Sequence, residues 1–363
     1  MTFTGTGFTG TATVIIDDLE CAVTDQSDTH ITCTTQDKPV ELVKEHHPSL
    51  QINIAGIGDV ATQGFVYRYV ALWSDTRTWG GDFLPEEGDA IEILPGRSLL
   101  VDVDSTPVLS FLVVQGSLIF EPHESDKTHH RTFDAKYIIV NGGYMEVGTE
   151  QFPYDSKLTI TMHGDEYTPA LPIYGNKCIS VRYGQLEMHG KPVSHTWTDL
   201  WETADVGADS ITLNDVEGVE LDWEVGSQIV IASTDFVGSH AEKRTITSIT
   251  DRDTKPVIGL DSALTYKHFA GIDTFGDDTI EMRAEVGLLS RSVIYRGDPE
   301  TSAENQYGAH IMLASPGNES VIGRIEYIEV TDAGQAFKLG RYPIHYHMIG
   351  TVMKSYIKHN SIW

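Results

Sequence analysis

A unit that recurs three times between residues 113 and 188 decides the fold. The copies read Val113-Val114-Gln115-Gly116-Ser117-Leu118-Ile119-Phe120, Ile139-Val140-Asn141-Gly142-Gly143-Tyr144-Met145-Glu146-Val147 and Ser180-Val181-Arg182-Tyr183-Gly184-Gln185-Leu186-Glu187-Met188. In each copy β-forming residues precede a turn glycine, and a strand of alternating side chains follows it. The uneven spacing of Gly116, Gly143 and Gly184 is typical of stacked β-solenoid coils with loops inserted between them. Glycine permits the tight bend or positive φ that such corners need.

A more regular repeat lies near the C-terminus. Residues 324–332 (RIEYIEVTD) resemble residues 354–362 (KSYIKHNSI), as two coils of a parallel β-helix would, with Asp332 or Asn360 at a turn. Helix-period stretches are scarce in the rest of the chain, so we predict an all-β protein. The repeat, which continues to Trp363, leads us to expect that further coils follow in a longer protein.

The N-terminal 70 residues have the pattern of a separate Ig-like sandwich. Its predicted strands are Ala12–Ile16, His30–Thr34, Leu50–Ile54 and residues 64–69. Cys21 and Cys33 lie close enough in sequence to form a disulfide in an oxidising compartment, which leaves Cys178 as a buried thiol. The sequon Asn318-Glu319-Ser320 predicts a glycosylation site at Asn318 and fits secretion.

The chain is strongly acidic. Its 53 Asp and Glu residues against 25 Lys and Arg give a formal net charge of −28. Such a surface repels nucleic acid and anionic lipid, and favours calcium, cationic partners or neutral sugars, although acidity also serves solubility alone. Calcium is therefore the one candidate cofactor that the composition suggests. No apolar run approaches the roughly 20 residues that span a bilayer, and no leader follows Met1. We therefore expect an internal piece of an ectodomain whose membrane segment, if any, lies outside it.

Several quoted strings also resemble a known family. The opening Thr4-Gly5-Thr6-Gly7-Phe8, the cysteine pair and Phe65-Val66-Tyr67 resemble an IPT/TIG domain. From Trp73 the chain resembles a G-eight domain. The similarity continues through residues 196–200 (TWTDL), 222–226 (DWEVG), 229–236 (IVIASTDF), 283–291 (RAEVGLLSR) and 341–347 (RYPIHYH). Together these resemble the fibrocystin and fibrocystin-L family, which is related to cell-surface hyaluronidase and to the cell-migration-inducing hyaluronan-binding protein.

The resemblance implies three domains and two alternative functions. The expected domains are an IPT/TIG domain over residues 1–70, a G-eight domain over 72–195, and the start of a right-handed parallel β-helix over 196–363. One function is extracellular or cell-surface recognition of a glycan, matrix or cell-surface protein, as in a receptor or adhesion glycoprotein. The other is calcium-dependent depolymerisation of hyaluronan on the β-helix face. Fold-level similarity does not choose between them.

The candidate site centres on His345-Tyr346-His347. On a strand both imidazoles would project from one face, where they could bind a metal or act as acid and base on a sugar. Arg341 is near enough to hold the carboxylate of an acidic glycan, and Arg283 and Arg291 could join it in one basic groove. The histidines could instead simply fill the β-helix face. No third metal ligand is identifiable, and none of the many acidic pairs is singled out as a hydrolytic pair.

Overall fold

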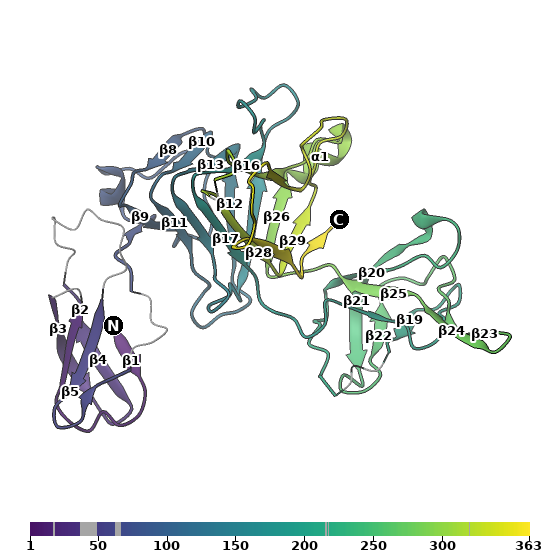
Figure 1. Ribbon diagram of the computed structural model, residues 1–363, viewed down its shortest axis with the longest axis horizontal. Coiled ribbons are helices and arrows are strands. Elements are labelled where there is room, and N and C mark those ends of the chain that lie inside the picture. The colour runs from purple at the N-terminus through teal and green to yellow at the C-terminus, as the bar shows by residue number, and fades with distance from the viewer. Residues whose placement is uncertain (17–18, 37–48, 62–66, 215, 217, 319) are drawn as a thin grey trace.

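A computed structural model describes the chain from residue 1 to 363, except residues 17–18, 37–48, 62–66, 215, 217 and 319. Nearly all of its regular structure is β-strand. Figure 1 shows a parallel β-helix in the middle, with an N-terminal sandwich on one side and a second β domain on the other. The predicted all-β fold, with an Ig-like domain and a β-helix, is confirmed.

The N-terminal domain is an antiparallel module around its own core. Its strands, in the order in which they pair, are β1 (Thr2–Thr4), β4 (His30–Thr34), β3 (Leu19–Gln26), β2 (Ala12–Ile16), β5 (Leu50–Ile54) and β6 (Gly58–Asp59). The predicted disulfide is present, and Cys21 and Cys33 are both buried in this core. The predicted strand at residues 64–69 begins outside the described residues, and Tyr67 to Tyr69 are not in a strand.

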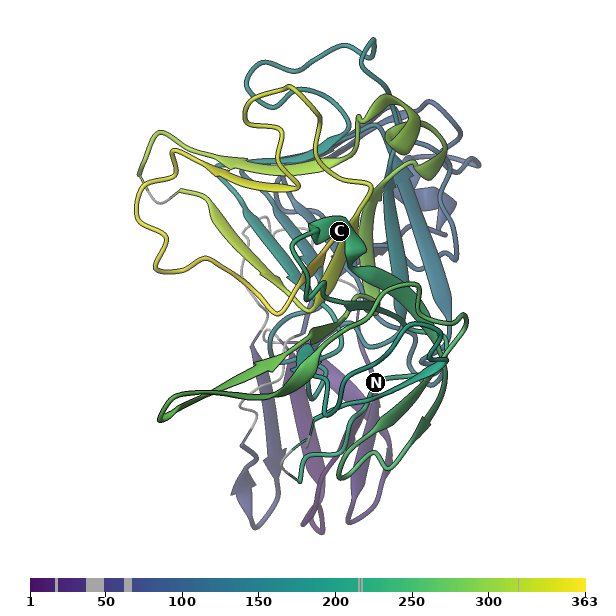
Figure 2. The same ribbon diagram turned by 90° about the vertical axis from the view of Figure 1, so that its right-hand side faces the viewer.

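Three parallel sheets form the faces of the β-helix, and Figure 2 views its coils nearly end on. The first face contains β8 (Ala90–Ile93), β10 (Phe111–Val114), β13 (Tyr137–Asn141), β16 (Cys178–Arg182), β27 (His310–Ala314) and β30 (Ile344–His347). The second contains β7 (Ala71–Leu72), β9 (Ser98–Leu100), β11 (Ser117–Phe120), β14 (Tyr144–Val147), β17 (Gln185–His189), β28 (Ile322–Glu326) and β31 (Tyr356–Lys358). The third contains β12 (His130–Ala135), β15 (Lys157–Met162), β26 (Val293–Gly297), β29 (Ile328–Thr331) and β32 (Ser361–Ile362).

Both predicted repeats are stacked coils. The first strand of each glycine unit pairs in parallel with the next, and so does the strand after the glycine. The C-terminal repeat behaves likewise, because Arg324 pairs with Tyr356 and Glu329 with Ser361. Inward side chains of all three faces share one continuous core. A short helix, α1 (Pro299–Asn305), and the 3₁₀ turn η1 (Thr76–Trp79) lie between coils.

An antiparallel domain interrupts the β-helix between β17 and β26. Its six-stranded sheet runs β18 (Trp197–Asp199), β25 (Glu285–Leu288), β20 (Gln228–Ile231), β21 (Glu242–Thr250), β22 (Val257–Leu260) and β19 (Ser210–Thr212). It also contains η2 (Gly238–His240) and the hairpin of β23 (Ala270–Phe275) and β24 (Asp278–Arg283). Its own core surrounds the buried Trp223. The expected boundary after residue 195 therefore falls at the entry to this inserted domain, and parallel coils lie on both sides of it.

Candidate functional site

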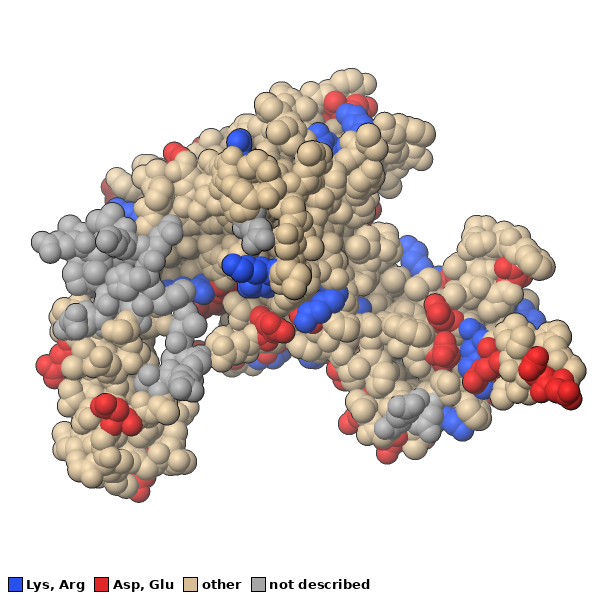
Figure 3. Space-filling view, viewed as in Figure 1, with Lys and Arg blue, Asp and Glu red and all other residues tan. Residues whose placement is uncertain are grey.

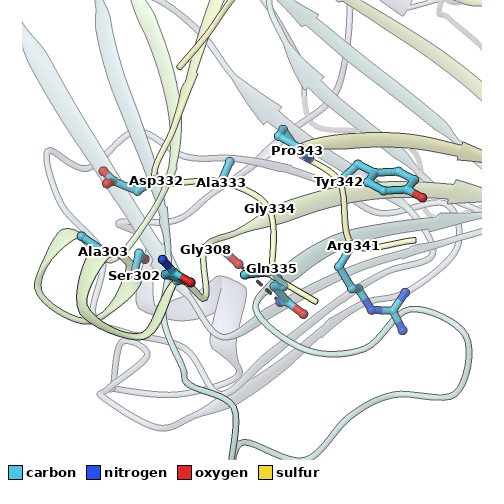
Figure 4. Close-up of a pocket in the computed structure, with 12 residues that line it drawn as sticks. Ser302, Ala303, Gly308, Asp332, Ala333, Gly334, Gln335, Arg341, Tyr342 and Pro343 are labelled. Carbon is cyan, nitrogen blue, oxygen red and sulfur yellow. Dashed lines mark hydrogen bonds between the residues drawn. The ribbon is translucent and has the colours of Figure 1, made fainter. Parts of the chain in front are cut away.

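A cavity of about 420 Å³ opens at the corner between the third and first faces of the β-helix. Figure 4 shows Ser302 and Ala303 of the α1 segment on one side of it and Arg341 and Tyr342 on the other. The remaining lining comes from the turns around Gly308 and residues 332–336, and from Pro343. Asp332 is the only carboxylate among the described residues that line the cavity.

The two predicted histidines lie beside this cavity on β30. His345 pairs with Met312 and His347 with Ala314, while Tyr346 between them turns inward against the core. Both imidazoles therefore project from one face, with their ring centres 5.1 Å apart. His345 Nδ1–H donates to the Gly340 carbonyl at 2.7 Å. Because a carbonyl oxygen only accepts, this hydrogen bond requires a proton on Nδ1 of His345.

Arg341 precedes the histidines and has no acidic partner among the described residues. Its Nη1 lies 3.8 Å from Met312 Sδ, and its guanidinium approaches the backbone at Gly175. Tyr342 is 46% exposed, and its ring centre lies 5.1 Å from that of His345. An arginine without an ion-pair partner beside an exposed aromatic ring can both bind an anion and pack against a sugar.

His310 is a third histidine in this region, and it is fully buried beneath the cavity. Its Nε2–H donates to the Tyr174 carbonyl at 2.7 Å, and its Nδ1 accepts from Gln335 Nε2 at 3.4 Å. Burial lowers the pKa of His310 to about 4, and the nearby charge of Arg341 acts in the same direction. His310 is therefore neutral near pH 7 and serves packing. The Oε1 of Gln335 is buried without a hydrogen-bond partner in the described part of the chain.

The other two predicted arginines lie elsewhere. Arg283 is in the inserted domain, where it pairs with Glu281 and donates to the carbonyls of Leu200 and Trp201. Arg291 is buried where that domain returns to the β-helix, and it donates to the Leu288 and Ser290 carbonyls. Burial lowers the pKa of Arg291 to about 10. The structure therefore does not bring Arg283 and Arg291 into one groove with Arg341.

A buried acidic ladder on the second face is absent from the sequence prediction. Glu146 pairs in register with Glu187, and Glu187 with Arg324. Arg324 Nη1 lies 2.6 Å from Glu187 Oε1, and Arg68 Nη2 lies 2.8 Å from Glu146 Oε2. Burial raises the pKa of Glu187, and the charge of Glu146 adds to this shift. The three glycine units between residues 113 and 188 could have predicted this ladder, because a glutamate stands third after the turn glycine in the last two of them.

The remaining predicted features are scattered. Asn318 is exposed, while Glu319 of its sequon lies outside the described residues. Trp201 has Lys255 Nζ 3.3 Å from its ring centre and Arg283 at 5.2 Å, so those cations occupy its ring. Across the described ranges, no group of three or more His, Cys, Asp or Glu side chains is placed to hold a metal ion. Nor do these ranges contain a helix long and apolar enough to cross a membrane.

Comparisons with known proteins agree with the domain order. Family models match an IPT/TIG domain at residues 1–69, a G8 domain at 78–201 and a CEMIP beta-helix at 306–363. Over 99% of the chain, fibrocystin-L of Mus musculus is 36% identical and that of Homo sapiens 35%. Protein rliB of Dictyostelium discoideum is 28% identical over 82% of the chain. The chain spans only 9% of the length of either fibrocystin-L and 25% of rliB.

Proposed function

Since the chain is fibrocystin-L-like in sequence over almost its whole length and in its domain order, we propose that it is a recognition segment of an extracellular or cell-surface protein. The similarity fits the ectodomain of a secreted or membrane-held protein. Within it, we propose that the cavity beside β30 binds a glycan. The single observation that carries this proposal is that Arg341, which has no acidic partner in the described part of the chain, lines the cavity together with the exposed Tyr342.

The composition of the cavity favours binding over hydrolysis. Glycoside hydrolysis ordinarily needs two carboxyl groups roughly 5 to 10 Å apart, and Asp332 is the only acid among the described lining residues. The arginines of the last third are also dispersed, since Arg324 pairs with Glu187 and Arg296 contacts Thr161 on other faces. A long polyanion would find no continuous basic groove along these residues. Recognition of a short glycan segment is the function that fits this arrangement best.

A glycan array followed by calorimetry tests the binding proposal. We expect the intact chain to retain a subset of glycans, and Arg341→Ala and Tyr342→Ala each to weaken the best one by about tenfold. Arg283→Ala is the matched control, because it removes an arginine that is remote from the cavity and should leave binding unchanged. Equal affinity for wild type and both cavity variants would contradict the proposal.

The acidic ladder favours a second candidate, depolymerisation of hyaluronan. Neighbouring parallel strands lie about 4.8 Å apart, so Glu146 and Glu187 are at a separation that retaining glycosidases use. Both are at least 90% buried, so Arg68 would have to move before a sugar could reach them. Fluorescent hyaluronan should be incubated with the chain in calcium or chelator, beside Glu187→Gln and a His345→Ala/His347→Ala double variant. Shortening that only Glu187→Gln abolishes would assign the chemistry to the second face. Unchanged polymer length from pH 4 to 8 would leave binding as the function.

A further inference from the structure

The β23–β24 hairpin of the inserted domain is a sheet of only two strands. Six cross-strand pairs run from Ala270–Arg283 to Phe275–Asp278, and in the described ranges no third strand joins either edge. Figure 1 shows the hairpin at the far tip of the domain. An isolated two-stranded hairpin is marginally stable in water, and its outer edges expose unpaired backbone N–H and C=O groups. These edges are suited to pairing with a further strand.

One face of the hairpin carries three exposed apolar side chains beside Asp273 and Asp278. Paired residues of an antiparallel hairpin share a face, so Met282, Ile280 and Phe275 lie on the same side. Their exposed fractions are 39%, 46% and 59%. The sheet of the inserted domain does not cover them, because its buried core ends at Ala270 and Ala284. Burying these three side chains under a partner would supply the hydrophobic contact that the hairpin lacks.

The charge of the hairpin selects the kind of partner. Asp273, Asp277, Asp278 and Glu281 are all exposed, and Figure 3 shows acidic atoms gathered at this tip. The one cation of the hairpin, Arg283, is already engaged by Glu281 and two backbone carbonyls. A second copy of the hairpin would place like charges opposite one another, which destabilises strand pairing. Electrostatics therefore favour a basic partner.

We propose that this hairpin is a protein-docking site that takes an extended, basic segment of a partner protein as a third strand. Main-chain hydrogen bonds at one open edge would supply affinity. Apolar side chains of the added strand would pack beside Phe275 or Ile280, whichever lies on that edge, and its lysines or arginines would lie near the exposed acids. The proposal goes beyond glycan recognition, and it uses no residue of the cavity.

The test uses a synthetic ten-residue peptide of alternating lysine and valine, measured by biolayer interferometry on the intact chain in 0.15 M salt. The same peptide with alternate backbone nitrogens methylated has equal charge but cannot complete a strand ladder. We expect the parent peptide to bind at least tenfold more tightly than the methylated one. Phe275→Ser/Ile280→Ser should remove this preference, whereas Phe236→Ser, which alters an exposed phenylalanine of the same domain outside the hairpin, should preserve it.

Three outcomes would overturn the proposal. Equal binding of both peptides would show attraction to the acidic surface without strand addition. Unchanged binding to Phe275→Ser/Ile280→Ser would place the interaction elsewhere. Concentration-dependent dimerisation in analytical ultracentrifugation that this double variant abolishes would identify a second copy of the chain as the occupant.

Discussion

Gly143 stands where one coil turns against the next, and close approach of the backbone explains the glycine. A β-carbon built there would lie 2.5 Å from the carbonyl oxygens of Gly116 and Val114. Gly184 meets the Gly143 oxygen in the same way one coil later. None of the three corner glycines has a positive φ, which is adopted instead by Gly142. The sequence allowed either a tight bend or a positive φ at these glycines, and the structure shows that the tight bend is the reason.

Gly143→Ala should therefore destabilise the β-helix. The added methyl group can be accommodated only by moving the neighbouring coil, and overpacking of this kind costs about 1–3 kcal/mol. The free energy of unfolding from urea titration measures it. Gly238→Ala is the control, because a β-carbon there meets nothing within 4 Å. Equal stability of the two variants would contradict the argument from close approach.

His310 should make stability depend on acid. Its folded-state pKa of about 4 lies below the unfolded value of about 6.5, so the unfolded chain takes up the proton first as the pH falls. The contribution of neutral His310 to the free energy of unfolding is fully present above about pH 6.5. It is lost as the pH falls from about 6.5 to about 4. Relative to His310→Gln, the wild type should lose up to about 3 kcal/mol over that interval.

Urea titrations at several pH values measure this difference. His359→Gln, which alters an exposed histidine, serves as the control and should follow the wild type. A difference between wild type and His310→Gln that stays constant with pH would contradict the assignment.

At the scale of elements, the second face shows how stacking creates interactions. Glu187 of β17 lies between Glu146 of β14 and Arg324 of β28, and only the last carries a compensating charge. His189 extends the network with Nε2 at 2.8 Å from Tyr356 Oη on β31. Polar side chains thus connect four strands, β14, β17, β28 and β31, that lie far apart in the sequence. These contacts favour a single strand register.

Arg324→Met should destabilise the chain by about 2 kcal/mol at pH 7, because it leaves the buried Glu187 carboxylate without its cation. Burial already raises the folded-state pKa of Glu187, and the loss of Arg324 raises it further. The penalty is therefore fully present above these two raised pKa values and is lost as the pH falls through them, because protonation removes the uncompensated charge. A double-mutant cycle with Glu187→Leu measures the coupling. Strictly additive single effects, or a penalty that does not vary with pH, would contradict this account.

At the scale of the whole molecule, the inserted domain begins and ends at adjacent points of the β-helix. The Lys191 backbone N–H donates to Ser292 Oγ at 2.8 Å, which closes the gap between the two junctions. The insertion has its own apolar core, separate from that of the β-helix. The two cores should therefore unfold as separate cooperative units.

Replacing residues 192–290 with a short glycine–serine linker should leave the β-helix folded. The junctions need no rearrangement, so we expect its thermal transition, followed by circular dichroism, to move by only a few degrees. Trp223→Ala provides an independent check, since it should accelerate hydrogen exchange in residues 196–289 and leave the β-helix strands protected. Loss of a cooperative transition after excision would show that the insertion supports the coils.

Local sequence alone determined the all-β class, three N-terminal strands (β2, β4 and β5), the Cys21–Cys33 disulfide and the stacked coils. These depend on period-two alternation and turn glycines, which are properties of short segments. The side-by-side placement of His345 and His347 followed for the same reason.

Only the tertiary structure decided which coils are neighbours. It placed β17 against β28 across the whole inserted domain, and so brought Glu187 to Arg324. It also left Arg341 without an acidic partner among the residues that the structure describes, whereas Arg283 and Arg291, which look equally available in sequence, are held by backbone carbonyls. The pairing and ionisation of a side chain depend on what lies beside it along the stacking direction. That neighbour is set by strand register across loops of any length, which no local pattern encodes.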